Sequence, residues 1–227
     1  MSEEPVVLDR LAGVCGELVL RRVGPDFEII ANGVFLMDTR GGASERLLVS
    51  AAADRMRAGG RLLVGGLGVG FSLRAALDHP RVGDVVVVER ERAVIDWNRG
   101  TLRTLHGDAL ADPRARCVAG DLLAWLPSAG EVFDGICLDI DNGPEWTVTE
   151  SNAALYERAG LDMLTGALAP GGVLAVWSAG ASPAFAARLA ERFGEVETLV
   201  IPVPRGEPDL VYLARAPVTR SRSLKRN

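Results

Sequence analysis

The sequence predicts an α/β fold with a seven-stranded, mostly parallel sheet, a C-terminal antiparallel hairpin and a small β-rich piece at the N-terminus. From residue 61 onward, short apolar runs alternate with helix-like stretches, which is the pattern of a doubly wound parallel sheet. Near the end of the chain, the strand-like runs 196–203 and 210–214 are separated only by residues 204–208. That connection is too short for a crossover helix, so the two strands must form an antiparallel hairpin.

Residues 1–58 are predicted to form the N-terminal piece, which joins the main domain without a flexible linker. Its strand-like runs lie at 18–22, 27–31 and 34–38. Asn32-Gly33 between the last two runs is typical of a two-residue hairpin turn. Residues 1–10 are expected to be loose or a short lead-in. A helix from about residue 43 to 57 follows, because its apolar residues keep helical spacing.

The main domain is predicted to span residues 59–218, and a flexible basic tail is expected at 219–227. Its further strands are expected at 62–64, 85–88, 117–119, 133–138 and 173–177. Its helices are expected at 71–77, 93–99, 122–126, 152–167 and 183–193. Strands that are covered by helices on both faces are continuously apolar rather than alternating, as these runs are.

Composition excludes several classes of protein. A formal net charge of −5 without a basic stripe argues against nucleic acid as a partner. No apolar run approaches the ~18 residues that a membrane-spanning helix needs. Cys15, Cys117 and Cys137 are widely spaced and lack C-x-x-C pairing, so neither a metal site nor a disulfide framework is expected. This cysteine usage, with no signal peptide, predicts a reducing, cytoplasmic location.

A glycine-rich turn follows the first strand of the main domain. The run Gly65-Gly66-Leu67-Gly68-Val69-Gly70 lacks side chains where the backbone must turn and let a ligand approach. The helix that follows points its free N–H groups at that ligand. The next strand ends at Glu89, where an acid can accept hydrogen bonds from both ribose hydroxyls. We therefore predict a nucleoside site made by Gly66, Gly68, Gly70 and Glu89.

The spacing of the glycines indicates which nucleoside is bound. A dinucleotide fingerprint, G-x-G-x-x-G, would place a third glycine at position 71, which is Phe71. The pattern present is G-x-G-x-G, which is typical of enzymes that bind S-adenosylmethionine. The alternative is a glycine-rich turn without a ligand, and the acid at Glu89 argues against it.

A third strand is expected to end at Gly120-Asp121. The Asp121 carboxylate could accept a hydrogen bond from an adenine amino group, and Leu122 could pack against the base. Alternatively, Asp121 is the N-cap of the helix at 122–126. The two roles are compatible.

The central strand ends at Asp139, and an acidic loop follows through Asp141, Asn142 and Trp146. Carboxylates beside a tryptophan suit a cationic amine, with Glu145 and Glu150 expected to add negative charge nearby. An amine must lose a proton before it attacks a sulfonium carbon, so Asp139, helped by Asp141, is predicted to accept that proton. The alternative is a solvated acidic loop with Asn-Gly-Pro making its turn.

These residues resemble the spermidine synthase-like proteins, the polyamine aminopropyltransferase branch of the Rossmann-like class I S-adenosylmethionine-dependent methyltransferase fold. The resemblance spans roughly residues 32–216 and rests on the glycine turn, Leu77-Asp-His-Pro80, Val86-Val-Val-Glu89, Gly120-Asp121 and Phe133-Asp-Gly-Ile-Cys-Leu-Asp139. It implies an S-adenosyl sulfonium donor, usually decarboxylated S-adenosylmethionine, whose aminopropyl group passes to an amine. It also implies a homodimer, with Glu89 on the ribose, Asp121 on the adenine and Asp139 as the catalytic proton acceptor.

The sequence also departs from that family. Spermidine synthases carry an aspartate in the glycine turn, whereas Leu67, Gly68 and Val69 occupy this region here. Asn142 replaces the second acid of their D-x-x-D, and of their Tyr-His-Glu only Glu45 remains. We therefore expect Glu45, Asn142 and Trp146 to contact the acceptor, in a reaction other than ordinary spermidine synthesis.

Three hypotheses of function follow from the sequence. The first is aminopropyl transfer to an amine. The second is methyl transfer from S-adenosylmethionine itself, because the acid that selects a decarboxylated donor is missing. The third is a nucleoside-binding protein without catalysis, against which Glu89, Asp121 and Asp139 argue.

Overall fold

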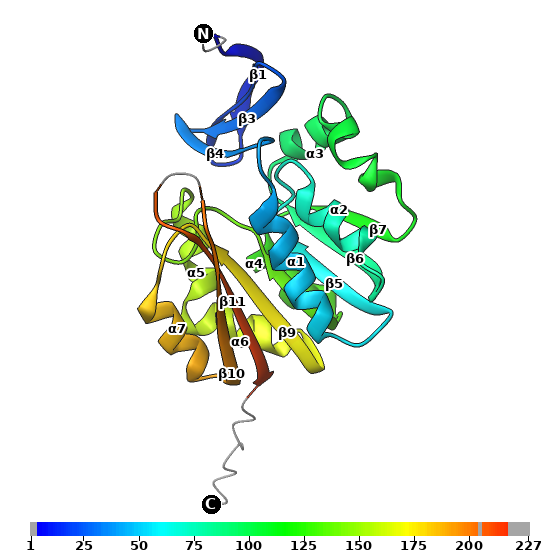
Figure 1. The fold of residues 1–227 in the computed structure, drawn as a ribbon, viewed down its shortest axis with the longest axis vertical. Coiled ribbons are helices and arrows are strands. Elements are labelled where there is room, and N and C mark those ends of the chain that lie inside the picture. Colours follow the sequence, from blue (N-terminus) through cyan, green and yellow to red (C-terminus); the bar gives the residue numbers. More distant parts are fainter. Residues whose placement is uncertain (1–3, 204–205, 218–227) are drawn as a thin grey trace, which may run out of the picture.

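The structure is a computed structural model that describes residues 4–203 and 206–217. The predicted basic tail and part of the predicted turn at 204–208 lie outside the described residues. Two sheets make up the fold: a four-stranded sheet at the N-terminal end and a seven-stranded sheet flanked by helices (Figure 1).

The large sheet has the predicted architecture. Its strand order is β10-β11-β9-β8-β5-β6-β7, and β5 pairs in parallel with both β6 and β8. The strand β11 runs antiparallel to β9 and β10, which confirms the C-terminal hairpin. The bounds are β5 Gly60–Gly65, β6 Val82–Glu89, β7 Ala115–Ala119, β8 Phe133–Leu138, β9 Leu168–Ser178, β10 Phe193–Ile201 and β11 Asp209–Pro217.

Helices cover both faces of this sheet. One layer holds α1 (Ala43–Arg55), α2 (Phe71–Asp78) and α3 (Arg92–Arg99). The other holds α4 (Leu122–Ala129), α5 (Ala153–Tyr156), α6 (Arg158–Gly166) and α7 (Pro183–Ala190). Within β5, Leu62 and Val64 join the core of the first layer, while Leu63 joins that of the second. Burial on both faces explains the continuously apolar strands.

The small sheet has one strand more than the sequence predicts. Its order is β1 (Val6–Gly13), β2 (Gly16–Val23), β3 (Asp26–Ala31) and β4 (Val34–Asp38), all antiparallel. The expectation that residues 1–10 are loose or a short lead-in was wrong from Val6 onward, where β1 begins. This edge strand is exposed along most of its length, so it shows no apolar periodicity, and pairing with β2 defines it.

The predicted helix at 152–167 is interrupted. A 3₁₀ turn at Glu150–Asn152 leads into α5, and the chain becomes extended at Glu157 before α6 begins. Gly160 lies against the end of α5, where an added Cβ would be 2.2 Å from the carbonyl oxygen of Ala154. Further 3₁₀ turns at Arg103–His106 and Ala109–Ala111 follow α3.

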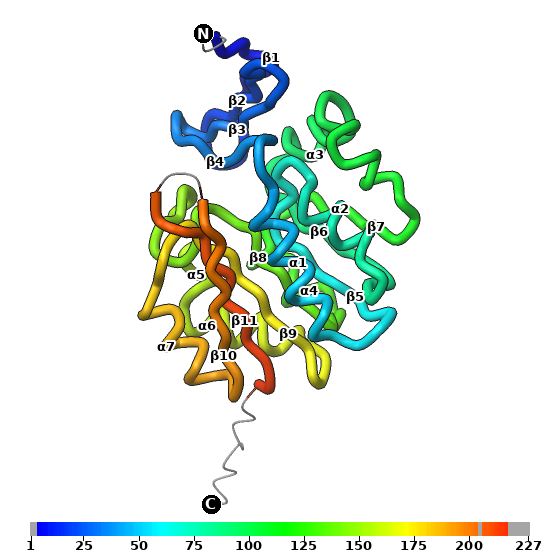
Figure 2. Tube along the Cα trace, viewed as in Figure 1, coloured from blue at the N-terminus to red at the C-terminus, as the bar shows by residue number. Residues whose placement is uncertain are grey.

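The small sheet lies at one end of the large one, next to the start of α1 and close to α3 (Figures 1 and 2). Two hydrogen bonds join it to the region of α3. Trp97 Nε1 donates to Asp9 Oδ2 at 2.8 Å, and the Val14 amide donates to Glu91 Oε2 at 2.8 Å.

Candidate active site

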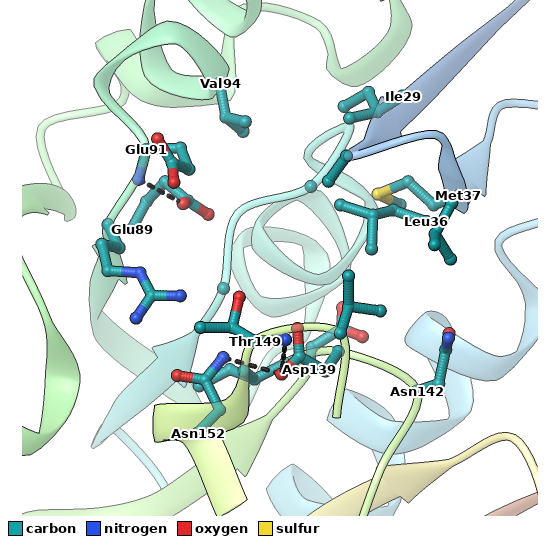
Figure 3. A pocket seen from close by; sticks show the side chains of 18 of the residues that line it. Ile29, Leu36, Met37, Glu89, Glu91, Val94, Asp139, Asn142, Thr149 and Asn152 are labelled. Carbon is teal, nitrogen blue, oxygen red and sulfur yellow. Dashed lines mark hydrogen bonds between the residues drawn. The ribbon is translucent and has the colours of Figure 1, made fainter. Parts of the chain in front are cut away.

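A cavity of about 700 Å³ lies between the carboxyl ends of the parallel strands and the small sheet. Figure 3 shows Glu89 and Glu91 on one side, Ile29, Leu36 and Met37 across from them, and Asp139 between the two sides. The wall on the strand side carries acids predicted from the sequence, while Ile29, Leu36 and Met37 of the small sheet supply apolar surface.

The glycine turn lets two strand ends approach each other. Gly66 has φ of 93°, and an added Cβ there would lie 2.1 Å from the Asp139 carbonyl oxygen. Gly66 and Gly68 line the cavity. Gly70 is not part of the described cavity wall; it is the N-cap of α2 and lies against His106.

Glu89 is held between the glycine turn and the start of α3. Its Oε2 accepts a 2.9 Å hydrogen bond from the Leu67 amide, and its Oε1 accepts one of 2.8 Å from the Glu91 amide. Burial raises the pKa of Glu89, and these two amide donors act against that rise. Each carboxylate oxygen has a further lone pair, so the group can still accept hydrogen bonds from a diol.

Asp121 caps a helix and also faces the cavity. Its Oδ1 accepts from the Ala124 amide at 3.2 Å, so the N-cap geometry of α4 is present. Arg90 Nη1 donates to Asp121 Oδ2 at 3.2 Å, an ion pair that the sequence did not indicate. Leu122 lines the cavity directly beside it. The adenine contacts of Asp121 and Leu122 stay predictions.

Asp139 lies at the centre of the site. Ser72 Oγ donates a 2.6 Å hydrogen bond to Asp139 Oδ2. Burial, followed by the nearby charge of Glu45, raises the pKa of Asp139 to about 7. A carboxyl group with such a pKa can take up a proton near neutral pH, which is the property that a general base needs.

Asp141 organises the loop that follows. Its backbone is left-handed, with φ of 53°, and its Oδ2 accepts from Asn152 Nδ2 at 2.8 Å and from the Thr149 amide at 3.4 Å. Burial raises its pKa. Asp141 lines the cavity, but one of its oxygens is engaged in holding the loop closed. Its predicted catalytic role remains a prediction.

The rest of the predicted loop is divided between the cavity and the surface. Asn142 lines the cavity, and its carbonyl oxygen accepts from the Ala179 amide at 3.0 Å. Trp146 stands at the rim and is 58% exposed. Glu145 instead bonds to Ser182, and neither Glu145 nor Glu150 is part of the described cavity wall. That these two glutamates add negative charge near Asp139 stays a prediction.

Several residues of the site were missed in the sequence. Glu45 lines the cavity, and its contact with the acceptor stays a prediction, whereas Ser44, which donates to Glu45 Oε2 at 3.0 Å, was not singled out. Asp209 lines the cavity because β11 runs antiparallel, so its first residue lies at the edge where the parallel strands end. Burial raises the pKa of Asp209. An acid at the start of a predicted antiparallel strand was the signal that could have identified it.

The cavity wall is strongly acidic. Its carboxylates come from both sheets, from α1 and from the loops that follow the strands: Glu17, Asp38, Glu45, Glu89, Glu91, Asp121, Asp139, Asp141 and Asp209. Among the described lining residues, Arg90 is the single arginine or lysine, and it is paired with Asp121. Such a wall attracts cations.

Two properties of the described residues bear on other kinds of site. Within 4–203 and 206–217, no helix has the length and hydropathy needed to cross a membrane. In the same residues, no group of three histidine, cysteine or acidic side chains is arranged to hold a metal ion.

The sequence also matches a known protein family. The family model described as the spermine/spermidine synthase domain matches residues 46–192. A polyamine aminopropyltransferase of Mycobacterium tuberculosis is 33% identical over 167 residues, which cover 70% of this chain and 30% of that protein. Polyamine aminopropyltransferase 2 of Pseudomonas aeruginosa is 35% identical over 119 residues, covering 51% of this chain and 32% of that protein. The chain thus spans about a third of the length of these curated relatives.

Solved structures resemble the fold as a whole. A spermidine synthase in complex with the transition state analogue AdoDATO superimposes with a TM-score of 0.76 at 17% identity, covering 92% of this chain and 73% of that one. The spermidine synthase of Thermotoga maritima gives a TM-score of 0.74 at 17% identity, covering 92% and 72%. At this level of identity, the likeness shows the fold.

Proposed function

Because the chain belongs to the spermine/spermidine synthase family, we propose that it transfers an aminopropyl group from decarboxylated S-adenosylmethionine to an amine acceptor. The observation that carries this proposal is the position of Asp139. It lies in an acid-lined cavity, its pKa is raised to about 7, and the Ser72 hydroxyl orients it.

The donor would lie along the strand ends. Gly66 and Gly68 leave room for the nucleoside, and Glu89 is fixed with lone pairs free for the ribose hydroxyls. Asp121 and Leu122 would hold the adenine, with Arg90 keeping the Asp121 carboxylate in place through their ion pair. Gly70 would contribute to this site by beginning α2, and not by contacting the donor.

The acceptor amine would approach from the side of the loop and of α1. Glu45, Asp141 and Asn142 line this part of the cavity, and Trp146 stands at its rim. Asp139 takes a proton from the ammonium group, and the freed nitrogen attacks the carbon next to the sulfonium. The new N–C bond forms as the C–S bond breaks, and the bonding pair stays on sulfur to give methylthioadenosine.

A product assay tests this function. Incubation with decarboxylated S-adenosylmethionine and a series of diamines, followed by mass spectrometry, should yield methylthioadenosine and an aminopropylated amine in equal amounts. Formation of neither product with any diamine, although the protein binds methylthioadenosine, would contradict aminopropyl transfer.

Methyl transfer is a second candidate, which one observation favours. The glycine turn carries Leu67 and Val69, both buried, and no acid that could grip the terminal amine of a decarboxylated donor. Calorimetric titration separates the two reactions. A methyltransferase should bind S-adenosylhomocysteine more tightly than methylthioadenosine, whereas the aminopropyl reaction requires the opposite order. Binding of neither compound would favour the non-catalytic hypothesis.

The proposal also includes the predicted homodimer and cytoplasmic location. Membership of the family supports the dimer. Analytical ultracentrifugation tests it, and a species with the mass of a single chain over the micromolar range would contradict it.

A further inference from the structure

Two buried polar residues lie behind the glycine turn, on the side away from the cavity. Asn98, in the last turn of α3, is 0% exposed, and His106, in the 3₁₀ turn that follows, is 1% exposed. Neither residue is part of the described cavity wall, and the proposed reaction uses neither side chain.

Their hydrogen bonds lead directly to the turn. Asn98 Nδ2 donates to the Gly68 carbonyl oxygen and to the Val94 carbonyl oxygen, both at 2.8 Å. His106 Nδ1 accepts from the Ala109 amide at 3.1 Å, so the proton of the neutral ring is on Nε2, which donates to the Asn98 carbonyl oxygen at 3.2 Å. Burial lowers the pKa of His106, which keeps the ring neutral.

The same two residues fill the space beside Gly70. This glycine has φ of 87°, and an added Cβ would lie 2.6 Å from His106 Cδ2 and 3.0 Å from Asn98 Oδ1. The imidazole and the amide therefore set how far the end of the turn can move away from the cavity. On the opposite side, Glu89 holds the Leu67 amide at 2.9 Å.

We propose that Asn98, supported by His106, is a positioning residue that fixes the donor-binding turn through the Gly68 carbonyl. The inference rests on the proposed function, since it requires that a nucleoside binds at this turn. The amide orientation is specific. With oxygen and nitrogen exchanged, the amide oxygen would face the Gly68 and Val94 carbonyl oxygens, and both contacts would be repulsive. At this position, only a hydrogen-bond donor can bond to the Gly68 carbonyl oxygen.

Asn98→Leu tests the inference, because leucine has a similar shape but no donor. Calorimetry with methylthioadenosine and S-adenosylhomocysteine should show affinity for the nucleoside falling by at least about tenfold, the usual loss for one buried hydrogen bond. The KM for the acceptor amine should stay within about twofold of the native value, because the acceptor does not touch the turn. His106→Leu should weaken nucleoside binding less, since it acts on Gly68 through Asn98, and it serves if the first variant does not fold.

Ser182→Ala is the matched control. Ser182 is 0% exposed and caps α7, away from the cavity wall. Its loss should lower Tm while nucleoside affinity stays within about twofold. Native-like nucleoside affinity in the folded Asn98 or His106 variant would overturn the inference. The inference would also be overturned if the Asn98 variant and Ser182→Ala, at equal Tm, lost the same amount of nucleoside affinity. If the native protein bound neither nucleoside, both the proposed function and this inference would be contradicted. If the native protein bound a nucleoside and the variants bound it equally well, only this inference would be contradicted.

Discussion

The hydroxyl of Ser72 donates a 2.6 Å hydrogen bond to Asp139. Ser72 belongs to α2, the helix that begins at the glycine turn, whereas Asp139 follows β8. The helix proposed to receive the donor therefore also orients the proposed base. This hydrogen bond favours the ionised carboxylate and acts against the rise in pKa that burial and Glu45 cause.

Ser72→Ala should shift the pH dependence of the reaction. Removing a donor to the ionised form raises the pKa of Asp139, and a protonated carboxyl cannot act as a base. The acidic limb of kcat/KM should move upward by about one to two pH units, since a hydrogen bond to a charged group contributes roughly 1.5–3 kcal/mol. A pH–rate profile measures the shift. Ser72→Thr, which keeps the hydroxyl, should leave the limb in place, and an unmoved limb in the alanine variant would show that the bond does not tune Asp139.

Asp139→Asn should separate catalysis from donor binding. The amide keeps the shape of the side chain but cannot accept a proton, so kcat should fall by roughly 10² to 10⁴, the usual contribution of a general base. Affinity for methylthioadenosine, measured by calorimetry, should remain close to native. If turnover were normal, Asp139 would only orient the substrate.

The same substitution should change how stability depends on pH. The pKa of Asp139 is about 7 in the folded chain against an ordinary value of 3.8 for an aspartate, so between these pH values the folded state holds a proton that the unfolded state releases. Between these values, the free energy of unfolding falls as pH rises. We expect Asp139→Asn to raise Tm at pH 8 and to have a smaller effect near pH 4. Thermal unfolding followed by circular dichroism at several pH values checks this, and a variant less stable than native at pH 8 would contradict it.

Glu89→Gln should weaken nucleoside binding. The carboxylate holds the Leu67 and Glu91 amides, and an NH₂ group in place of one oxygen must oppose one of these donors. The Kd for methylthioadenosine should rise by roughly 10- to 100-fold, as expected when a hydrogen bond to a charged group is lost. Glu195→Gln, at an exposed glutamate paired with Arg215, is the control and should bind normally. Equal affinity of the two variants would refute the ribose assignment.

Asp209→Asn should affect the acceptor and not the donor. This acid lies on the cavity wall contributed by β11, whereas the nucleoside residues follow β5, β6 and β7. Loss of its charge should raise the KM for a diamine by roughly three- to tenfold, in line with one ion pair. The Kd for methylthioadenosine should not change. Asp78→Asn, which removes an exposed acid outside the cavity wall, controls for net charge. An unchanged KM in the Asp209 variant would place the acceptor elsewhere.

The predictable part of this protein is the part that local patterns encode. Apolar runs and turn residues predict the strands and helices of the large sheet. Acids at the ends of these strands predict the site residues Glu89, Asp121 and Asp139, because the carboxyl ends of parallel strands meet at one edge. All three line the cavity. The prediction needed no knowledge of which strands are neighbours.

The unpredicted part depends on tertiary contacts. Ser72 looks like any small helical residue, and its importance appears only when α2 and β8 are placed together. The edge strand β1 is too exposed to show a pattern. The roles of Asn98 and His106 depend on the 3₁₀ turn after α3, which folds back on the glycine turn.

The attachment of the small sheet connects two walls of the cavity through one helix. Asp9 is bonded to Trp97, and the Val14 amide to Glu91. The Glu91 amide bonds in turn to Glu89, and Asn98 bonds to the glycine turn. Opposite walls of the cavity are thus hydrogen-bonded to the eight-residue helix α3 and to Glu91, the residue that precedes it. The distance between these two walls therefore depends on the position of α3. A substitution in the loop after Asp139 leaves these bonds in place, whereas a change in α3 or in the β1–β2 turn acts on the small sheet and the glycine turn together.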